Sequence, residues 1–547
     1  MKIKLCIFTI FCFSLAMLIG ACCPKNPTLN SCITAHGNTD WHIDTAEEFL
    51  TGRDMAGNPS AANHCPNSWT KRHMHVGLSN TNHYYYDPDL TTPGDDSDPT
   101  NGIDMAMLFF YAGHGNPTTW NCLGNNGHQT NVQLGDCPPE NGGLLRYYWQ
   151  CSCAVFAHGP KVCPGSTHDY TCPGSFDGSP DSNNMRNVFE RWGPAIDPDL
   201  RMACGASTSA YCHESQTNRI WYNYNILHYD VADAFINGLK GTSWVVPLCI
   251  TCGGADVTAT PLYDATFTNL ANQSGRTHYH IQYLSSFAST PRTSSISMEI
   301  PEALPVFDMG LMSKPRSLQN KKLEVSGDMM VSEELAGDRG SKVTVYNQSG
   351  AVYIMGERTK ETSSSAALSE EIYLDKAKSF IKTEGWSERE MAAPIGNKIM
   401  IESMPIKGEN QEIQKTQKDV IVSFARQIQT ENGSIPVLGE GGKITIQMNN
   451  DGSIYNASKV WRSIKQGTTQ SMVQVKNYEE AYKEALEQLE NSNQYRLDNW
   501  TWGYKELAGN IKQDKMGIVF IFEFMPISEE DSFDYPPQMI EIAGQDI

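Results

Sequence analysis

Two short segments of the chain place a base and a possible nucleophile at the ends of apolar runs. The run Met105–Tyr111 leads to a His-Gly pair that contains His114. The run Leu144–Trp149 leads to a Cys-Ser-Cys segment that contains Cys151 and Cys153. An imidazole beside a cysteine promotes the thiolate, which attacks acyl carbons. The pattern predicts nucleophilic catalysis by cysteine, provided that the fold brings the two segments together.

Both runs have the composition of buried strands. If they are parallel neighbours, His114 and a cysteine leave the same edge of the sheet, where open α/β sheets carry their sites. Gly113 and Gly115 flank the histidine. Because glycine has no Cβ, the backbone can turn sharply there and approach a ligand closely.

The remaining pattern of the first half indicates what positions these segments. Short apolar runs alternate with amphipathic segments and long polar loops, which predicts a mostly parallel α/β sheet. The expected strands are Asp104–Tyr111, Leu144–Ser152, Leu200–Ala203 and Ser243–Cys249, and the expected helices are Thr45–Leu50, Asn184–Trp192 and Asp230–Leu239.

The two motifs, in this order, resemble those of the caspase-like cysteine peptidases, which include caspases, gingipains, clostripain and legumain. The resemblance covers about residues 37–260 and is nearest to uncharacterised exported bacterial proteins of this class. It implies a mostly parallel sheet with helices on both faces. It also implies that Cys153, preceded by Ser152, is the nucleophile and His114 the catalytic histidine. Gly115 would supply an oxyanion-hole N–H together with the N–H of Cys153.

The resemblance further implies hydrolysis of peptide bonds through a thioacyl intermediate, with a peptide or protein as substrate and no cofactor. Two alternatives remain open. Cys151 competes with Cys153 for the nucleophile position, and a disulfide at either cysteine would abolish its nucleophilicity. The same fold could therefore be a catalytically inactive, disulfide-bonded binding or surface module.

Metal binding is the main rival chemistry. His73 and His75, and likewise His278 and His280, are spaced so that both imidazoles of a pair lie on one side of a strand. The chain has no HExxH motif, and the Cys249–Cys252 pair has no partner pair at regular spacing. The acidic run 95–98 is a candidate calcium loop, although a solvated loop is the simpler explanation. No metal is therefore predicted.

The N-terminus indicates export. Residues 1–21 combine a short basic start with an apolar run, as in a signal peptide, and the segment before Cys22 resembles a bacterial lipobox. Cys22 would become the lipidated N-terminus of a membrane-anchored lipoprotein of the bacterial cell envelope. The formal net charge of −20 makes nucleic acid an unsuitable partner because an acidic surface repels phosphate.

Cysteine and histidine are confined to one half of the chain. All 14 histidines lie before residue 281, and after the leader and Cys22 the remaining 13 cysteines all lie before residue 253. Export favours disulfides. Candidate pairs of near neighbours are Cys122/Cys137, Cys163/Cys172, Cys204/Cys212 and Cys249/Cys252. Because 13 is odd, at least one thiol is expected to be unpaired within the monomer.

The domain prediction follows from this segregation: a signal peptide over 1–21, an α/β domain over 22–285, a connector over 286–320 and an α+β antiparallel domain over 321–547. The connector has one candidate strand, at Ser295–Ile300. The α+β domain is expected to hold strands at Lys342–Met355, Val420–Gln429, Lys443–Met448 and Gly517–Phe524, with helices at Ser369–Lys382 and Tyr478–Leu489.

Asn450-Asp451-Gly452 predicts a tight hairpin turn within this domain. The segment Val420–Ile464 around it loosely resembles the PepSY-related modules of exported bacterial proteins. That resemblance implies a peptidase-regulating or scaffolding role, and a spacer domain is the simpler alternative.

Overall fold

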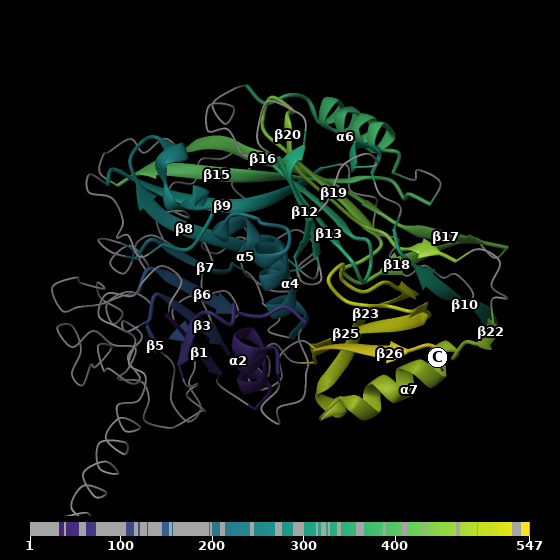
Figure 1. Ribbon diagram of the computed structural model, residues 1–547. Coiled ribbons are helices and arrows are strands. Elements are labelled where there is room, and N and C mark those ends of the chain that lie inside the picture. The colour runs from purple at the N-terminus through teal and green to yellow at the C-terminus, as the bar shows by residue number, and fades with distance from the viewer. Residues whose placement is uncertain are drawn as a thin grey trace, which may run out of the picture. The chain divides into compact units, whose positions relative to one another are not determined.

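The computed structural model describes residues 32–37, 40–53, 62–72, 106–113, 119–120, 128–129, 145–151, 156, 196, 200–207, 214–240, 245–268, 276–287, 300–312, 315–318, 324–326, 329–335, 341–356, 366–386, 390–406, 413–431, 433–465, 471–489, 491–527 and 538–545. The chain divides into two compact units. Unit 1 comprises Met1–Tyr283 with Glu402–Lys415, and unit 2 comprises Leu284–Ile401 with Thr416–Ile547. The fold class is α/β, with more strand than helix (Figure 1).

Unit 1 is built on a mixed sheet. Its strands are β1 (Cys32–Gly37), β2 (Thr70–Arg72), β3 (Leu108–Ala112), β6 (Tyr147–Cys151), β7 (Met202–Ala206), β8 (Pro247–Gly253) and β9 (His278–Phe287). They lie in the order β2-β1-β3-β6-β7-β8-β9. The pairs from β2 to β7 are parallel, and β8 and β9 join in antiparallel pairs. A short separate hairpin joins β4 (Thr119–Trp120) and β5 (His128–Gln129).

The central strands of this sheet are buried along their whole length. Every residue of β3, β6, β7 and β8 is buried. A strand with both faces covered reads as a continuous apolar run rather than an alternating one. That is the pattern from which these strands were predicted, and their existence is confirmed, with shifts of a few residues at their ends. The pairing of β3, β6 and β7 is parallel, as expected for a mostly parallel sheet, whereas β8 pairs antiparallel.

Unit 1 has three described helices of more than one turn: α2 (Asp40–Thr51), α4 (Glu214–Asn225) and α5 (Val231–Leu239). Helix α4 contacts both α2 and α5. Phe49 of α2 stacks on Phe110 of β3, with ring centroids 3.8 Å apart, and contacts Trp221 of α4. Phe235 of α5 contacts Trp149 of β6. Because Phe110 and Trp149 are cross-strand neighbours, these three helices share one face of the sheet.

The helix expectations for this unit have mixed outcomes. Thr45–Leu50 and Asp230–Leu239 are confirmed by α2 and α5. Residues 184–192 lie outside the described residues, so helices on both faces remain a prediction. Helix α4 was not predicted from the sequence. Its composition is polar, and it buries Gln216 and Thr217 beside its apolar residues.

Among the described residues of unit 2, two sheets each pack against a helix. The first has the strand order β11-β12-β13-β14-β20-β19-β16-β15. Its bounds are β11 (Glu324–Ser326), β12 (Met329–Leu335), β13 (Ser341–Tyr346), β14 (Val352–Met355), β15 (Ile395–Pro405), β16 (Gln414–Ala425), β19 (Lys443–Met448) and β20 (Ile454–Val460). Helix α6 (Glu370–Glu384) packs on this sheet and places Tyr373, Ala377 and Ile381 in the hydrophobic core between them. The predicted turn joins β19 to β20, with Gly452 at a φ of +75°.

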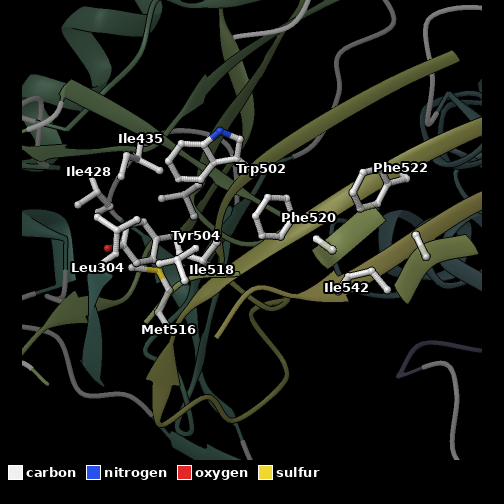
Figure 2. Close-up of a cluster of buried hydrophobic side chains, with 14 of the residues drawn as sticks. Leu304, Ile428, Ile435, Trp502, Tyr504, Met516, Ile518, Phe520, Phe522 and Ile542 are labelled. Atoms are coloured by element: carbon white, nitrogen blue, oxygen red, sulfur yellow. The ribbon is translucent and has the colours of Figure 1, made fainter. Parts of the chain in front are cut away.

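The second sheet of unit 2 has the order β17-β18-β23-β25-β26. Its strands are β17 (Gln427–Thr430), β18 (Gly433–Leu438), β23 (Tyr495–Lys505), β25 (Ile518–Pro526) and β26 (Gln538–Ala543). Helix α7 (Tyr478–Gln488) contacts β25 and β26. Figure 2 shows the core of this sheet, where Trp502, Tyr504 and Phe520 gather with Ile428 and Ile435.

The expected connector over 286–320 contains β10 (Ala303–Gly310). The strand considered there at 295–300 falls on residues of which only Ile300 is described. Strand β10 pairs with β21 (Ser463–Ile464), β22 (Ser471–Gln474) and β24 (Lys515–Met516). Leu304, Phe307 and Met309 of β10 enter the core of the second sheet. The alternation of burial is broken where Val306 and Phe307 are both buried, and Pro305 lies within the strand. Both features hid the strand within a Pro-rich segment. In the described part of the chain, no helix has the length and apolar character needed to cross a membrane.

Candidate active site at the carboxyl edge of the parallel sheet

The two motif strands are parallel neighbours. The register of β3 and β6 runs from Leu108 opposite Tyr147 to Ala112 opposite Cys151. Beyond this ladder, the Gly113 N–H donates to the Cys151 carbonyl oxygen at 3.2 Å. The strands therefore still lie side by side where each apolar run ends.

The predicted catalytic residues come directly after these last paired positions in the chain. His114 and Gly115 follow Gly113, and Ser152 and Cys153 follow Cys151. These four residues, and the predicted lipidation site Cys22, lie outside the described residues. What the structure establishes is the alignment of the two strands that lead into them.

Gly113 is required by its surroundings. A Cβ at this position would collide with the phenol of Tyr111. Tyr111 is buried, and its ring occupies the space where a side chain at residue 113 would start. The glycine before the histidine therefore has a packing reason as well as the conformational one inferred from sequence.

Cys151, the alternative nucleophile, is the last residue of β6. It is buried and disulfide-bonded. A sulfur in a disulfide has neither a thiol proton nor a thiolate to offer. The disulfide possibility raised from the sequence therefore holds at this cysteine, and in this form of the protein Cys151 offers no thiol for catalysis.

Gln150, the residue before Cys151, also lies at this edge and was not predicted from the sequence to have a role. Its side chain is fully buried, and neither its Oε1 nor its Nε2 has a hydrogen-bond partner within the part of the chain that the structure describes. It alternates with Trp149, so it lies on the face of the sheet away from α2, α4 and α5. A buried amide without partners is rare and costly. The sequence contained one signal of this feature: Gln150 is a polar residue at the end of a run predicted to be a buried strand.

The opposite end of the same strands is held by a buried ion pair. Arg201 donates to both carboxylate oxygens of Asp264, at 2.8 and 2.7 Å, and the Tyr147 hydroxyl donates to the same carboxylate at 2.8 Å. Burial raises the pKa of Tyr147, and the negative charge of Asp264 adds to this effect. Tyr147 begins β6 and Arg201 precedes β7, so this cluster anchors the amino ends of the strands.

Of the pair His278 and His280, considered above for metal binding, His280 forms hydrogen bonds within the protein. The Nδ1 of His280 lies 2.7 Å from the Ser403 hydroxyl, and its Nε2 lies 3.1 Å from the Gly254 carbonyl oxygen. Burial lowers the pKa of His280 to about 4. The imidazole is therefore neutral, with Nε2–H donating to the carbonyl and Nδ1 accepting from Ser403. Within the described residues, no three potential metal ligands come together. His73 and His75 lie outside them, as does the acidic run 95–98.

The buried cysteines show a pairing that the sequence did not indicate. Cys204 of β7 and Cys249 of β8 form a disulfide, which corrects the expected pairs Cys204/Cys212 and Cys249/Cys252. The two residues are 45 positions apart but directly opposite each other in the sheet. Cys65 and Cys252 are free and buried, and burial raises the pKa of both thiols. The other candidate pairs lie outside the described residues.

No family model and no curated protein matches the chain. Among solved structures, an uncharacterized protein from Eubacterium rectale is similar over 45% of this chain and 85% of its own, with 9% identity and a TM-score of 0.27. The C-terminal domain of Bacillus megaterium YpeB is similar over 41% of this chain and 88% of its own, with 13% identity and a TM-score of 0.18. Likeness at this level assigns neither a fold family nor a function.

Proposed function

We propose that the chain is an exported cysteine peptidase of the caspase-like kind, with Cys153 as nucleophile and His114 as proton shuttle. The observation that carries this proposal is the parallel register of β3 and β6, which ends with Ala112 opposite Cys151. Each proposed residue comes two positions later in the chain than its end of this register. Because parallel neighbouring strands lead their next residues to the same edge of the sheet, the register suits a Cys-His pair.

In the proposed chemistry, His114 acts first as a base and then as an acid in each of two steps, acylation and deacylation. The Cys153 thiolate, formed as His114 takes its proton, attacks the peptide carbonyl carbon, and the N–H groups of Gly115 and Cys153 bind the oxyanion. The C–N bond breaks as His114 protonates the leaving amine. Water then attacks the thioester and gives a proton to His114, which returns it to the departing sulfur. One oxyanion-hole donor contributes about 10²–10³ to the rate of such reactions.

The state of the described thiols supports the choice of cysteine. Cys151, Cys204 and Cys249 are in disulfides, and burial holds Cys65 and Cys252 in the unreactive thiol form. Among the cysteines of the two motifs, this leaves Cys153 as the proposed nucleophile.

A second candidate, an inactive binding or surface module on the same fold, is favoured by the disulfides. Cys151 is disulfide-bonded, and the Cys204–Cys249 bridge joins the adjoining strands β7 and β8. A domain stabilised in this way needs no free thiol. In that case Cys153 would itself be disulfide-bonded.

Hydrolysis of a mixed peptide library by the wild-type chain tests the proposal. We expect Cys153→Ala and His114→Ala each to lower turnover by at least about 10³-fold. Cys65→Ala is the matched control, because it removes a free but buried thiol, and it should retain turnover. If Cys153→Ala and His114→Ala both retain wild-type turnover, the peptidase assignment is wrong.

Native-state alkylation separates the two candidates. An active enzyme predicts that iodoacetamide modifies Cys153 in the folded protein, while Cys65 and Cys252 react only after denaturation. Recovery of Cys153 in a disulfide-linked peptide would instead favour the inactive module.

We also propose that the chain is held at the membrane by lipid on Cys22, as the lipobox-like leader suggests. Mass analysis of the N-terminal peptide should show an acylated Cys22, and Cys22→Ser should release the protein from the membrane fraction. An N-terminal peptide that begins elsewhere without lipid would contradict this.

A further inference from the structure

The second sheet of unit 2 carries a hollow of about 230 Å³ at one end of β25 and β26. Val519 and Ala543 line it and pair with each other across the two strands. Their chain neighbours Ile518 and Ile542 belong to the core under α7. Since side chains alternate along a strand, Val519 and Ala543 lie on the face away from that helix. Gly517 contributes no side chain, and Leu507 completes an apolar floor.

Two lysines border this hollow in different electrostatic states. Lys505 forms an ion pair with Glu541 at 2.5 Å, so its charge is compensated. Lys515 is exposed and makes no ion pair with any described residue, Asp308 opposite it on β10 included. The residues that line the hollow include no acidic side chain. The hollow therefore has one uncompensated positive charge beside an apolar floor.

The other polar groups of the hollow are already engaged. Gln545 donates to the Leu304 and Val473 carbonyl oxygens and accepts from the Ile518 N–H. Gln513 donates to the Lys505 carbonyl oxygen and accepts from the Leu507 N–H. Neither amide is available to recognise a polar side chain. Selectivity at this place rests on the charge of Lys515.

Strand β26 borders the hollow and is the last strand of its sheet. The Gly544 N–H donates inward to the Ile518 carbonyl oxygen. Because backbone groups alternate in direction along an antiparallel strand, those of Ala543 and Glu541 point away from β25. Among the described strands, β26 pairs with β25 alone. An open edge of this kind is a template for an added strand.

We propose that this edge and hollow form a binding site for the C-terminus of an extended peptide. The peptide backbone adds to β26, its last, apolar side chain enters the hollow, and its terminal carboxylate pairs with Lys515. Charge complementarity identifies this occupant: a C-terminus joins a carboxylate to an apolar side chain, and the hollow joins an uncompensated ammonium to an apolar floor. The site belongs to unit 2 and does not depend on the proposed peptidase chemistry.

Fluorescence polarisation with the full chain tests the site. The probes are fluorescein-labelled hexapeptides with Val, Leu or Ile as the last residue and mixed residues before it, prepared as free acids and as C-terminal amides. We expect the free acids to bind about tenfold more tightly than the amides. Lys515→Gln should remove that preference. Lys512→Gln is the matched control, since Lys512 is exposed nearby but paired with Asp514.

A separate variant tests whether the peptide backbone pairs with the edge of β26. Ala543→Pro deletes one outward N–H without removing an inward ladder bond, and proline is tolerated at sheet edges. It should weaken the binding of the free-acid peptides by about tenfold, while the melting temperature of the protein stays unchanged. Binding of acids and amides with equal affinity, loss of binding in Lys512→Gln equal to that in Lys515→Gln, or no binding of the free acids at all would each overturn the proposal.

Discussion

The parallel sheet of unit 1 and the antiparallel sheets of unit 2 place their strand ends differently. In the parallel part of unit 1, β1, β3, β6 and β7 all end at one edge, so segments far apart in the chain leave the sheet together. In unit 2, successive strands such as β23, β25 and β26 reverse direction, so their ends are divided between two edges. The first arrangement suits a catalytic site assembled from several loops.

The two units also differ in the types of residue that they contain. Every cysteine and histidine lies in the part of the chain assigned to unit 1. Both units bury ionic side chains: unit 1 has the Arg201–Asp264 pair, and unit 2 has a larger network around one carboxylate. Glu506, which is fully buried, accepts from Arg426 at 3.2 Å and from the Arg462 backbone N–H at 2.7 Å. Unit 1 therefore holds the reactive groups, whereas unit 2 uses charge to join its two sheets. Substitutions and changes of pH in each unit test that contrast.

The largest effect is expected at the buried charges of unit 2. Glu506→Ala leaves Arg426 and Arg462 buried without their carboxylate, and breaking a buried ion pair costs about 3–5 kcal/mol. Denaturant unfolding should show the loss in the transition of unit 2. Glu541→Ala, at the partly exposed pair with Lys505, is the control and should cost less than about 1 kcal/mol. Equal losses in the two variants would refute the structural role of the network.

A pH effect of intermediate size is expected in unit 1. The pKa of His280 is about 4 in the folded protein because the imidazole is buried, compared with an ordinary value of 6.5. The unfolded chain therefore binds the proton more readily, and stability falls as the pH drops from 6.5 toward 4, by about 3 kcal/mol in total. Urea unfolding of unit 1 from pH 7 to pH 4 measures this. The fall should be much smaller in His280→Gln, and an unchanged pH dependence would contradict the assignment.

The smallest effect is expected at the start of α7. Asn477 accepts from the Glu480 N–H, and Glu480 accepts from the Asn477 N–H, which together form a capping box. Asn477→Ala should cost about 1 kcal/mol, whereas Asn477→Asp should retain most of the stability. Thermal unfolding checks both variants. A loss in Asn477→Asp as large as that in Asn477→Ala would show that the side-chain oxygen is not the cause.

The sequence predicted those elements whose signals are local. Continuous apolar runs located β3, β6 and β8, the Asp-Gly pair located the β19–β20 hairpin, and amphipathic spacing located α6 and α7. The prediction missed β10 and α4. Neither carries a strong local signal, and each is stabilised by what it packs against: the core of the second sheet for β10, and α2 and α5 for α4.

For the candidate site, the sequence supplied the two motifs but not the features that depend on distant partners. It could not indicate that the amide of Gln150 is buried without partners, because burial depends on the fold around the strand. It also suggested sequence neighbours for Cys204 and Cys249. Their actual pairing follows from strand register, which brings together residues 45 positions apart.

By itself, the amino-acid sequence determined the α/β class, the division between a part rich in cysteine and histidine and a part without them, and the two strand-ending motifs. These depend on composition and on periodicities that operate within a few residues. The tertiary structure alone decided that β3 and β6 are neighbours in register, that His280 is satisfied by Ser403 and Gly254, and that Glu506 meets two arginines. The physical reason is that burial and partner choice are set by long-range packing.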